Sequence, residues 1–214
     1  MIPLDQLLSR ASLIALVTVT DARQVLPLAD ALSRGGLDVI EIAMRTDAAL
    51  EAIEVVRRER PGIVVGAGTV RSVDDLRRAT GAGASFVVTP GVTPELAMVM
   101  RDLELPLLPG AASPSEVMAL REMGFFLQKL FPIARLGGTR YLQDLSGPFP
   151  DIRFIPSGGV GADDTSAYLA LDNVAAVSGS WMAPRSLIER EAWSSIESLA
   201  RDASLAIRER NSSS

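Results

Sequence analysis

Lys129 is the only lysine among the 21 basic residues of the chain. It lies in the run 125–132, where large apolar side chains flank it on both sides. Because burial disfavours a charged amine, we expect Lys129 to be available as a neutral nucleophile. A neutral amine can form a Schiff base with a carbonyl, which the permanently charged guanidinium of arginine cannot do. The alternative is a half-buried lysine that extends its ammonium group to solvent, and composition alone favours neither interpretation.

Glu41 is a second candidate for chemistry, because its carboxylate interrupts the apolar run 39–43. Apolar surroundings favour the protonated form of a carboxyl group, which suits a general acid–base. Arg45 follows just past this run. Arg45 is either a structural ion-pair partner of Glu41, or its guanidinium binds a substrate carboxylate through two parallel hydrogen bonds.

The residue types that are missing exclude several classes of enzyme. The chain has no cysteine and no histidine. Thiol nucleophiles, iron–sulfur ligation and a Ser-His-Asp triad are therefore excluded, and the commonest transition-metal ligand is absent. We expect neither a metal nor an organic cofactor. The net charge of −5 argues against a nucleic-acid-binding protein, which usually has an excess of basic residues. The early apolar stretch 11–19 is too short to cross a bilayer and lacks the features of a secretory signal, so we expect a cytoplasmic protein.

The elements that position these candidate side chains are short apolar runs and amphipathic segments. The two kinds alternate along the chain, and the amphipathic segments repeat their apolar residues at the spacing of a helix. Cap residues such as Ser72, Thr93 and Ser113 open several of the helical segments. We expect one domain over residues 1–210, a long helix from about Pro184 to Arg208, and a disordered polar tail over 211–214. The predicted strands are Ile14–Thr20, Asp38–Met44, Ile63–Gly66, Ser85–Thr89, Leu105–Pro109, Phe125–Phe131, Ile152–Pro156 and Val174–Ser178.

Eight strand–helix units predict a compact (β/α)₈ barrel, an α/β fold, with a doubly wound open sheet as the alternative. In a barrel the functional groups gather where the strands end. Glycine stretches follow the seventh and eighth strands at Gly158–Gly159 and Gly179–Ser180. Their backbone N–H groups form either an anion cradle for a phosphate or two tight turns. The presence of both stretches at neighbouring strand ends favours a phosphate site.

The order and spacing of these motifs resemble the class I aldolases that cleave 2-keto-3-deoxy-6-phosphogluconate (KDPG), including members that act on 4-hydroxy-2-oxoglutarate (KHG). The resemblance runs from about Ala15 to Pro184. It is carried by residues 40–46, 66–70, 89–91, 109–110, 129–132, 147–149, 157–160 and 179–181.

This resemblance implies a role for each matching residue. Lys129 would be the Schiff-base lysine and Glu41 the general acid–base. Arg45 and Thr69 would bind the pyruvyl carboxylate, while Pro90 and Phe131 would line the pocket. The substrate and its phosphate would be bound by Ser157, Gly158, Gly159, Gly179 and Ser180.

Several positions depart from the usual family pattern. Ser157 replaces a threonine and keeps the hydroxyl, while Ala43 replaces another threonine. Ser178 replaces a glycine, and we expect it to narrow the phosphate cradle. Residues 133–135 read Ile-Ala-Arg where small or acidic residues are usual. These changes leave the lysine chemistry in place and bear on the choice of phosphorylated substrate.

The expected reaction is reversible cleavage of KDPG to pyruvate and glyceraldehyde 3-phosphate, a lyase reaction of the Entner–Doudoroff pathway of carbohydrate metabolism. The same chemistry on KHG or on 2-keto-3-deoxy-6-phosphogalactonate is an alternative. A non-catalytic barrel that binds sugar phosphates is a further alternative, because this fold hosts many functions. The resemblance also implies a homotrimer.

Overall fold

The computed structural model describes residues 12–212, and strands recur from Leu13 to Gly179. Each of the eight predicted runs contains or overlaps a strand, because such β-branched and apolar residues fit an extended, buried backbone. One additional short strand, β6, follows β5 after a single proline. The strands are β1 (Leu13–Val17), β2 (Val39–Ala43), β3 (Val64–Gly68), β4 (Val87–Val88), β5 (Leu107–Leu108), β6 (Gly110–Ala111), β7 (Leu127–Leu130), β8 (Arg153–Pro156) and β9 (Val177–Gly179).

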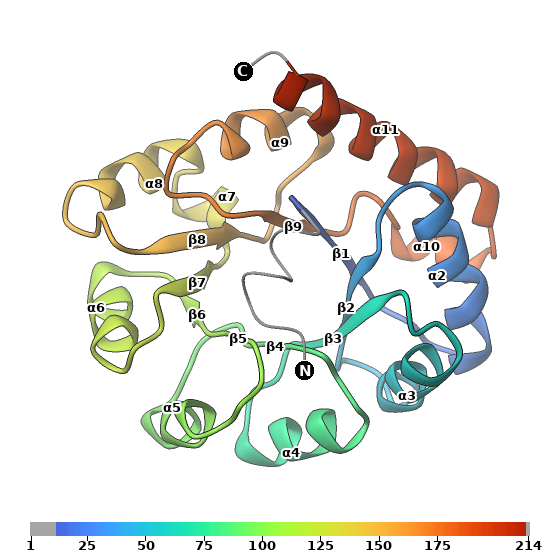
Figure 1. Ribbon diagram of the computed structural model, residues 1–214, viewed down its shortest axis with the longest axis horizontal. Coiled ribbons are helices and arrows are strands. Elements are labelled where there is room, and N and C mark those ends of the chain that lie inside the picture. The colour runs from blue at the N-terminus through green and yellow to red at the C-terminus, as the bar shows by residue number, and fades with distance from the viewer. Residues whose placement is uncertain (1–11, 213–214) are drawn as a thin grey trace.

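The strands form a curled parallel sheet in two hydrogen-bonded parts (Figure 1). The larger part has the order β5-β4-β3-β2-β1-β9, and the smaller has the order β6-β7-β8. Parallel bridges join Phe154 to Val174 and Ser157 to Ser178, so β8 also lies beside the β9 segment. Neighbours in the larger sheet follow the chain order from β1 to β5, without the reversal that a doubly wound sheet has. The alternative of a doubly wound sheet is therefore wrong.

Helices surround the curled sheet on its outer side (Figure 1). The cap residues predicted from the sequence begin three of them: the side chains of Ser72, Thr93 and Ser113 each accept a backbone N–H of the first helical turn. The helical elements are η1 (Ala22–Gln24), α2 (Val25–Arg34), α3 (Ala49–Glu59), α4 (Val73–Gly81), α5 (Pro94–Arg101), α6 (Pro114–Glu122), α7 (Ile133–Leu136), α8 (Thr139–Ser146), α9 (Ala162–Leu169), α10 (Arg185–Glu189) and α11 (Trp193–Ser212).

The C-terminal helix differs from the expectation. The single helix predicted from about Pro184 to Arg208 is wrong, because α10 ends at Glu189 and α11 begins at Trp193. Glu191 lies between them with φ of 54°, in the left-handed region, which interrupts the helix. Helix α11 extends to Ser212 and so includes two residues of the segment 211–214 that we expected to be disordered. Ser213 and Ser214 lie outside the described residues.

Two groups of buried side chains lie on opposite faces of the sheet. The larger group packs between the sheet and the helices. The smaller group lies on the inner face and consists of Ile14, Val39, Val64, Phe86, Val88, Leu108, Leu127, Ile155 and Ala176. Successive side chains of a strand point to opposite faces, so the residue two positions after an inner one also points inward. This alternation directs Glu41, Lys129, Ser157 and Ser178 to the interior, next to Val39, Leu127, Ile155 and Ala176.

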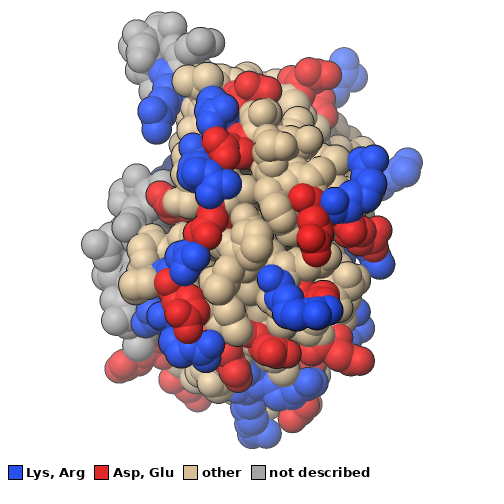
Figure 2. All heavy atoms as spheres, turned by 90° about the vertical axis from the view of Figure 1, so that its right-hand side faces the viewer, with Lys and Arg blue, Asp and Glu red and all other residues tan. Residues whose placement is uncertain are grey.

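The outer surface carries both signs of charge. Figure 2 shows basic and acidic side chains interspersed over one side of the molecule, without a large patch of a single sign. Ion pairs join neighbouring elements on the surface, including Arg34 with Glu197 and Arg60 with Asp30. Among the helices that the structure describes, none is long and apolar enough to cross a membrane.

Candidate active site

Lys129 and Glu41 meet on the inner face of the curled sheet. Lys129 Nζ donates a hydrogen bond to Glu41 Oε1 at 3.3 Å. The Lys129 side chain is 7% exposed and the Glu41 side chain 1% exposed. Charges attract more strongly in such a site than in water, because little solvent screens them. A proton can therefore pass directly between the amine and the carboxylate.

Ser178 binds the other oxygen of the same carboxylate. Its hydroxyl donates a hydrogen bond to Glu41 Oε2 at 3.0 Å, and the residue is 1% exposed. We expected Ser178 to narrow a phosphate cradle, but its hydroxyl is directed to Glu41. The two carboxylate oxygens of Glu41 thus have separate donors, one from β7 and one from β9.

The third side of the Glu41 carboxylate packs against the backbone of β3. A Cβ added to Gly68 would lie 2.7 Å from Glu41 Cγ, which is closer than real Cβ contacts allow. Gly68 therefore provides the space that the carboxylate occupies. The next residue, Thr69, has φ of 60°. A left-handed conformation is strained for a β-branched residue, and such strain is concentrated at functional sites.

Phe131 and Ser157 lie beside Lys129. The Phe131 ring centroid is 5.5 Å from Lys129 Nζ. Ser157 is fully buried, and its hydroxyl has no hydrogen-bond partner within the described residues. An unsatisfied buried hydroxyl costs free energy, so a polar group of a ligand would be favoured next to it.

The glycines predicted for phosphate binding begin directly after Ser157. Gly158 and Gly159 have φ of 89° and 81°, a region that side chains rarely adopt. Gly158 also packs against Phe131, since an added Cβ would lie 2.8 Å from Phe131 Cδ2. The loop therefore requires glycine at both positions. Gly179 at the end of β9 packs tightly against the indole ring of Trp181, which leaves no space for a side chain there.

Arg45 and Ser180 line a cavity of about 250 Å³ near the ends of β1, β2 and β9. Thr18 and Arg185 are in the same lining. Arg45 is exposed, and its guanidinium forms no ion pair with the described residues. The proposed structural pair between Arg45 and Glu41 is therefore wrong, and the Arg45 guanidinium is free to bind an anion.

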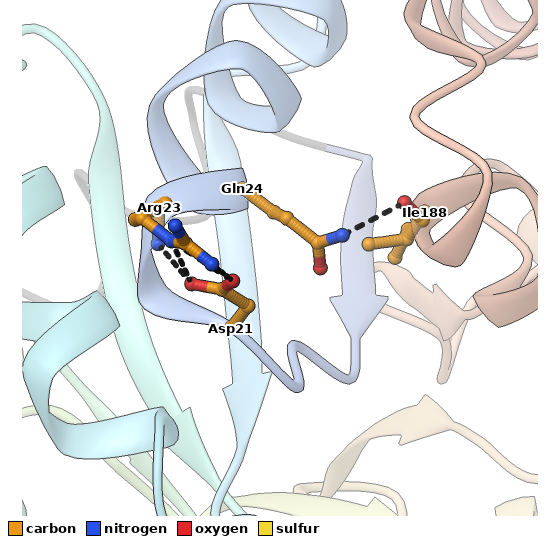
Figure 3. Close-up of polar contacts among 4 residues, drawn as sticks. All are labelled: Asp21, Arg23, Gln24 and Ile188. Atoms are coloured by element: carbon orange, nitrogen blue, oxygen red, sulfur yellow. Dashed lines mark hydrogen bonds and ion pairs between the residues drawn. The ribbon is translucent and has the colours of Figure 1, made fainter.

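Contacts between the β1–α2 connection and α10 support this cavity (Figure 3). Gln24 Nε2 donates a hydrogen bond to the Ile188 carbonyl of α10 at 3.4 Å. Asp21 caps η1 by accepting the Arg23 backbone N–H and also binds the Arg23 guanidinium, which lowers the pKa of the Asp21 carboxyl group. These contacts hold α10, which carries Arg185, beside the segment that carries Thr18.

Pro90 is separated from Lys129 by strand β6. Its backbone packs against Gly110, and Gly110 pairs with Lys129 in the register of β6 and β7. The Thr89 hydroxyl accepts the Gly110 backbone N–H at 3.0 Å, which fixes this turn. Pro90 is thus two strands away from the lysine, and a larger residue at position 110 would not fit between them.

A second cavity of about 310 Å³ lies on the other side of Arg45, where Arg71, Asp75 and Arg78 of the α4 region complete it. Asp75 accepts the Arg71 backbone N–H at 3.0 Å, so this carboxylate serves the helix cap. Within residues 12–212, no group of three or more acidic side chains is placed to hold a metal ion.

The model of the family described as "KDPG and KHG aldolase" matches residues 4–199 of this chain. The chain belongs to this family. A 2-dehydro-3-deoxy-phosphogluconate aldolase from Pseudomonas aeruginosa is 46% identical over 94% of this chain and 91% of its own length. A KHG/KDPG aldolase from Escherichia coli is 36% identical over 93% of both chains.

Solved structures of KDPG aldolases have the same fold. The Legionella pneumophila enzyme, with pyruvate captured at low pH as a covalent carbinolamine intermediate, has a TM-score of 0.91 and 37% identity, over 94% of this chain and 98% of its own. The Zymomonas mobilis enzyme with 3-phosphoglycerate has a TM-score of 0.87 and 34% identity, over 95% of each chain.

Sequence reasoning missed three residues of this site. It did not place Ser178 on Glu41, Gly68 under the carboxylate, or Arg185 in the cavity with Arg45 and Ser180. The position of Ser178 could have been found from the sequence. Ser178 follows Ala176 by two residues, as Glu41 follows Val39, so both side chains point to the same inner face of the sheet. Nothing in the sequence separates Arg185 from the other arginines.

Proposed function

We propose that this chain is a class I aldolase that reversibly cleaves KDPG to pyruvate and glyceraldehyde 3-phosphate. The buried pair of Lys129 and Glu41 is the observation that carries the proposal. Membership of the KDPG and KHG aldolases supports it, as does the likeness to an enzyme in which pyruvate was captured as a covalent carbinolamine. No group beyond the side chains of the chain is required for the chemistry that follows.

Imine formation begins with the loss of a proton from the Lys129 ammonium to Glu41, 3.3 Å away. The freed lone pair of Nζ attacks the C2 ketone of the substrate, and one proton of Nζ passes to the carbonyl oxygen to give a neutral carbinolamine. Glu41 then gives its proton to the carbinolamine hydroxyl, which leaves as water. This step produces a protonated imine between Nζ and C2 and restores the Glu41 carboxylate.

Cleavage uses this imine as an electron sink. Glu41 takes the proton of the C4 hydroxyl, the C3–C4 bond breaks, and its electron pair enters the imine to form an enamine. C4 leaves as the aldehyde carbon of glyceraldehyde 3-phosphate. The enamine carbon C3 then takes a proton from Glu41, and water adds at C2 to release pyruvate and the free amine.

The two ends of the substrate would lie in different parts of the site. We assign the pyruvyl carboxylate to Arg45 and Thr69, with Pro90 and Phe131 along the carbon chain. We assign the phosphate to the backbone of Gly158, Gly159, Gly179 and Ser180, and the unpartnered hydroxyl of Ser157 to a substrate hydroxyl. Arg185 also lines the cavity that Ser180 lines, where its guanidinium forms an ion pair with Glu189 at 2.7 Å.

We also propose that the curled sheet closes into a (β/α)₈ barrel. The bridges between the β8 and β9 segments and the single-residue gap between β5 and β6 support closure. Closure would bring the ends of β2, β7 and β9 to one mouth, as the site requires. From the family resemblance we further infer a homotrimer that works in the cytoplasm, and sedimentation of the purified protein tests the assembly.

Borohydride trapping with pyruvate tests the proposed function. Reduction of the imine should leave a stable pyruvyl adduct, and peptide mass spectrometry should find it on Lys129, the only lysine of the chain. An absence of the adduct in folded protein that still binds pyruvate would favour the non-catalytic alternative.

KHG is a second candidate substrate, and the E. coli relative named KHG/KDPG aldolase supports it. The galactonate epimer of KDPG is a third. Comparison of kcat/KM for the three substrates distinguishes them. A working phosphate site predicts that the phosphorylated substrates are preferred over KHG, because a site built to bind a group penalises its absence.

A further inference from the structure

We infer that Ser178 is a positioning residue, which holds the Glu41 carboxylate in place while Lys129 is covalently bound to the substrate. The inference rests on the proposed function and extends it to a residue that the family resemblance does not assign to catalysis. Two observations support it: the fixed position of Ser178, and the separate hydrogen-bond donors of the two Glu41 oxygens. The chemistry of imine formation adds a third argument, because it changes the Lys129 donor and leaves the Ser178 donor unchanged.

The backbone of Ser178 is fixed from both sides. Ser178 pairs with Ile14 of β1 in the parallel register, and a parallel bridge joins it to Ser157 beside β8. With 1% of its surface exposed, the side chain has little freedom to turn toward solvent. Its hydroxyl is thus presented to Glu41 by rigid elements, and groups on rigid elements hold a catalytic geometry better than groups on loops.

The Glu41 carboxylate is held by different donors at its two oxygens. Oε1 accepts from Lys129 Nζ at 3.3 Å, and Oε2 accepts from Ser178 Oγ at 3.0 Å. Gly68 packs against the carboxylate from the neighbouring strand. In the free enzyme both donors contribute to the orientation of the carboxylate.

Imine formation changes only one of these donors. Nζ gives up two of its hydrogens when it becomes doubly bonded to C2, and in the enamine it carries no formal charge. The protonated imine keeps one N–H and its charge while Glu41 takes the proton of the C4 hydroxyl. The ion pair at Oε1 is lost in the neutral enamine, at the stage at which Glu41 must protonate C3. The Ser178 hydroxyl takes no part in the bond changes, so it retains its hydrogen bond to Oε2 throughout the reaction.

The consequence is that loss of Ser178 Oγ should affect proton transfer and leave imine formation intact. Small displacements of a catalytic group cost about tenfold to a hundredfold in rate. We therefore expect Ser178→Ala and Ser178→Gly to slow proton transfer at C3 by about that factor. Glycine is the residue usual in the family pattern at this position, and both substitutions remove atoms only.

Two measurements on each variant separate these steps. Borohydride trapping with pyruvate reports imine formation at Lys129, and exchange of the pyruvate methyl hydrogens in D2O reports proton transfer at C3. Ser33→Ala is the matched control, because it also removes a serine hydroxyl that donates to a carboxylate, that of Asp38 at 2.6 Å before the first residue of β2. The control should have wild-type values in both measurements.

The expected result is slowed exchange, with trapping within about twofold of wild type. Exchange within twofold of wild type in both variants would overturn the inference. An equal loss of exchange and trapping would also overturn it, because Ser178 would then support the whole site. Failure of wild-type protein to form the adduct would instead refute the proposed function, so the two failures are distinguishable.

Discussion

The amine of Lys129 and the carboxylate of Glu41 lie 3.3 Å apart, although 88 residues separate them in the chain. Both side chains are almost fully buried. Removal of one partner of such a pair leaves a buried charge without a counter-charge, which costs several kcal/mol of stability. The proposed reaction requires both groups, because the amine forms the imine and the carboxylate transfers the protons.

Lys129→Arg should abolish turnover while it keeps a positive charge beside Glu41. A guanidinium cannot form the imine, so we expect the rate of pyruvate release to fall by more than about 1,000-fold, as when other covalent nucleophiles are removed. The assay is pyruvate release from KDPG, with borohydride trapping as a second readout. Retention of activity within tenfold of wild type would contradict the Schiff-base mechanism.

Glu41→Gln should separate binding from proton transfer. Glutamine has nearly the same shape and can still accept from Ser178, but it cannot take up or release a proton. Turnover should fall by about 10² to 10⁴, the usual contribution of a general acid–base. The adduct of pyruvate on Lys129 should also form more slowly under borohydride, because Glu41 takes the proton of the Lys129 ammonium in the first step. A variant with turnover within fivefold of wild type would show that another group transfers the protons.

Much of this site could be predicted from sequence because parallel strands end at the same side of a sheet. Lys129 and Glu41 each interrupt an apolar run, so they were expected to face one another near the mouth of a barrel. The two side chains do meet on the inner face of the curled sheet. Gly158 and Gly159 after β8, and Gly179 at the end of β9, were singled out for the same reason. Strands such as β2 were readily placed, because runs of β-branched residues favour an extended buried backbone.

The remaining features depend on register and on local backbone geometry, which the sequence pattern does not specify. The bond from Ser178 to Glu41 spans β1 and requires the pairing of Ile14 with Ser178. The end of α10 requires a left-handed Glu191, and no glycine or proline marks that position. Strand β6 is two residues long and follows Pro109, so no pattern of alternation could indicate it.

Gly68→Ala should displace the Glu41 carboxylate. The new methyl group would lie 2.7 Å from Glu41 Cγ, and overpacking of this kind costs about 1–3 kcal/mol of stability. We expect activity to fall at least tenfold as Glu41 moves.

Gly81→Ala in α4 is the control, because nothing lies within 4 Å of a Cβ added to Gly81. Since alanine favours a helix more than glycine does, this control should raise the stability of the protein by about 0.5–1 kcal/mol. Urea denaturation and kcat measure both variants, and wild-type kcat in Gly68→Ala would contradict the packing argument.

Arg60→Gln should destabilise the protein in a pH-dependent way. The Arg60 guanidinium binds both oxygens of Asp30, at 2.6 and 2.8 Å, and lowers the pKa of that carboxyl group. The stabilisation is complete above the unfolded pKa of about 3.9 and is lost as pH falls through the lower folded pKa. Both side chains are about a third exposed, so solvent screens the pair and we expect only a small loss of stability at pH 7. Urea denaturation at pH 7 and at pH 3 should show a difference from wild type that shrinks at the lower pH, and a difference that grows would contradict it.

Arg185→Gln should weaken recognition of the substrate phosphate and spare the chemistry at the pyruvyl end. Arg185 lines the cavity of about 250 Å³ that Ser180 and Arg45 share, and its own side chain is 61% exposed. Glu189 pairs with this guanidinium at 2.7 Å and competes with a bound anion, so kcat/KM for KDPG should fall by no more than about fivefold. The kcat/KM for the same sugar acid without phosphate should not change, and pyruvate methyl exchange should stay at the wild-type rate.

Arg190→Gln is the matched control, because Arg190 follows the same helix but does not line the cavity. Its Nε donates a hydrogen bond to the Ser186 carbonyl at 3.0 Å. Equal losses for the two substrates would assign Arg185 to the stability of α10 instead of the phosphate end.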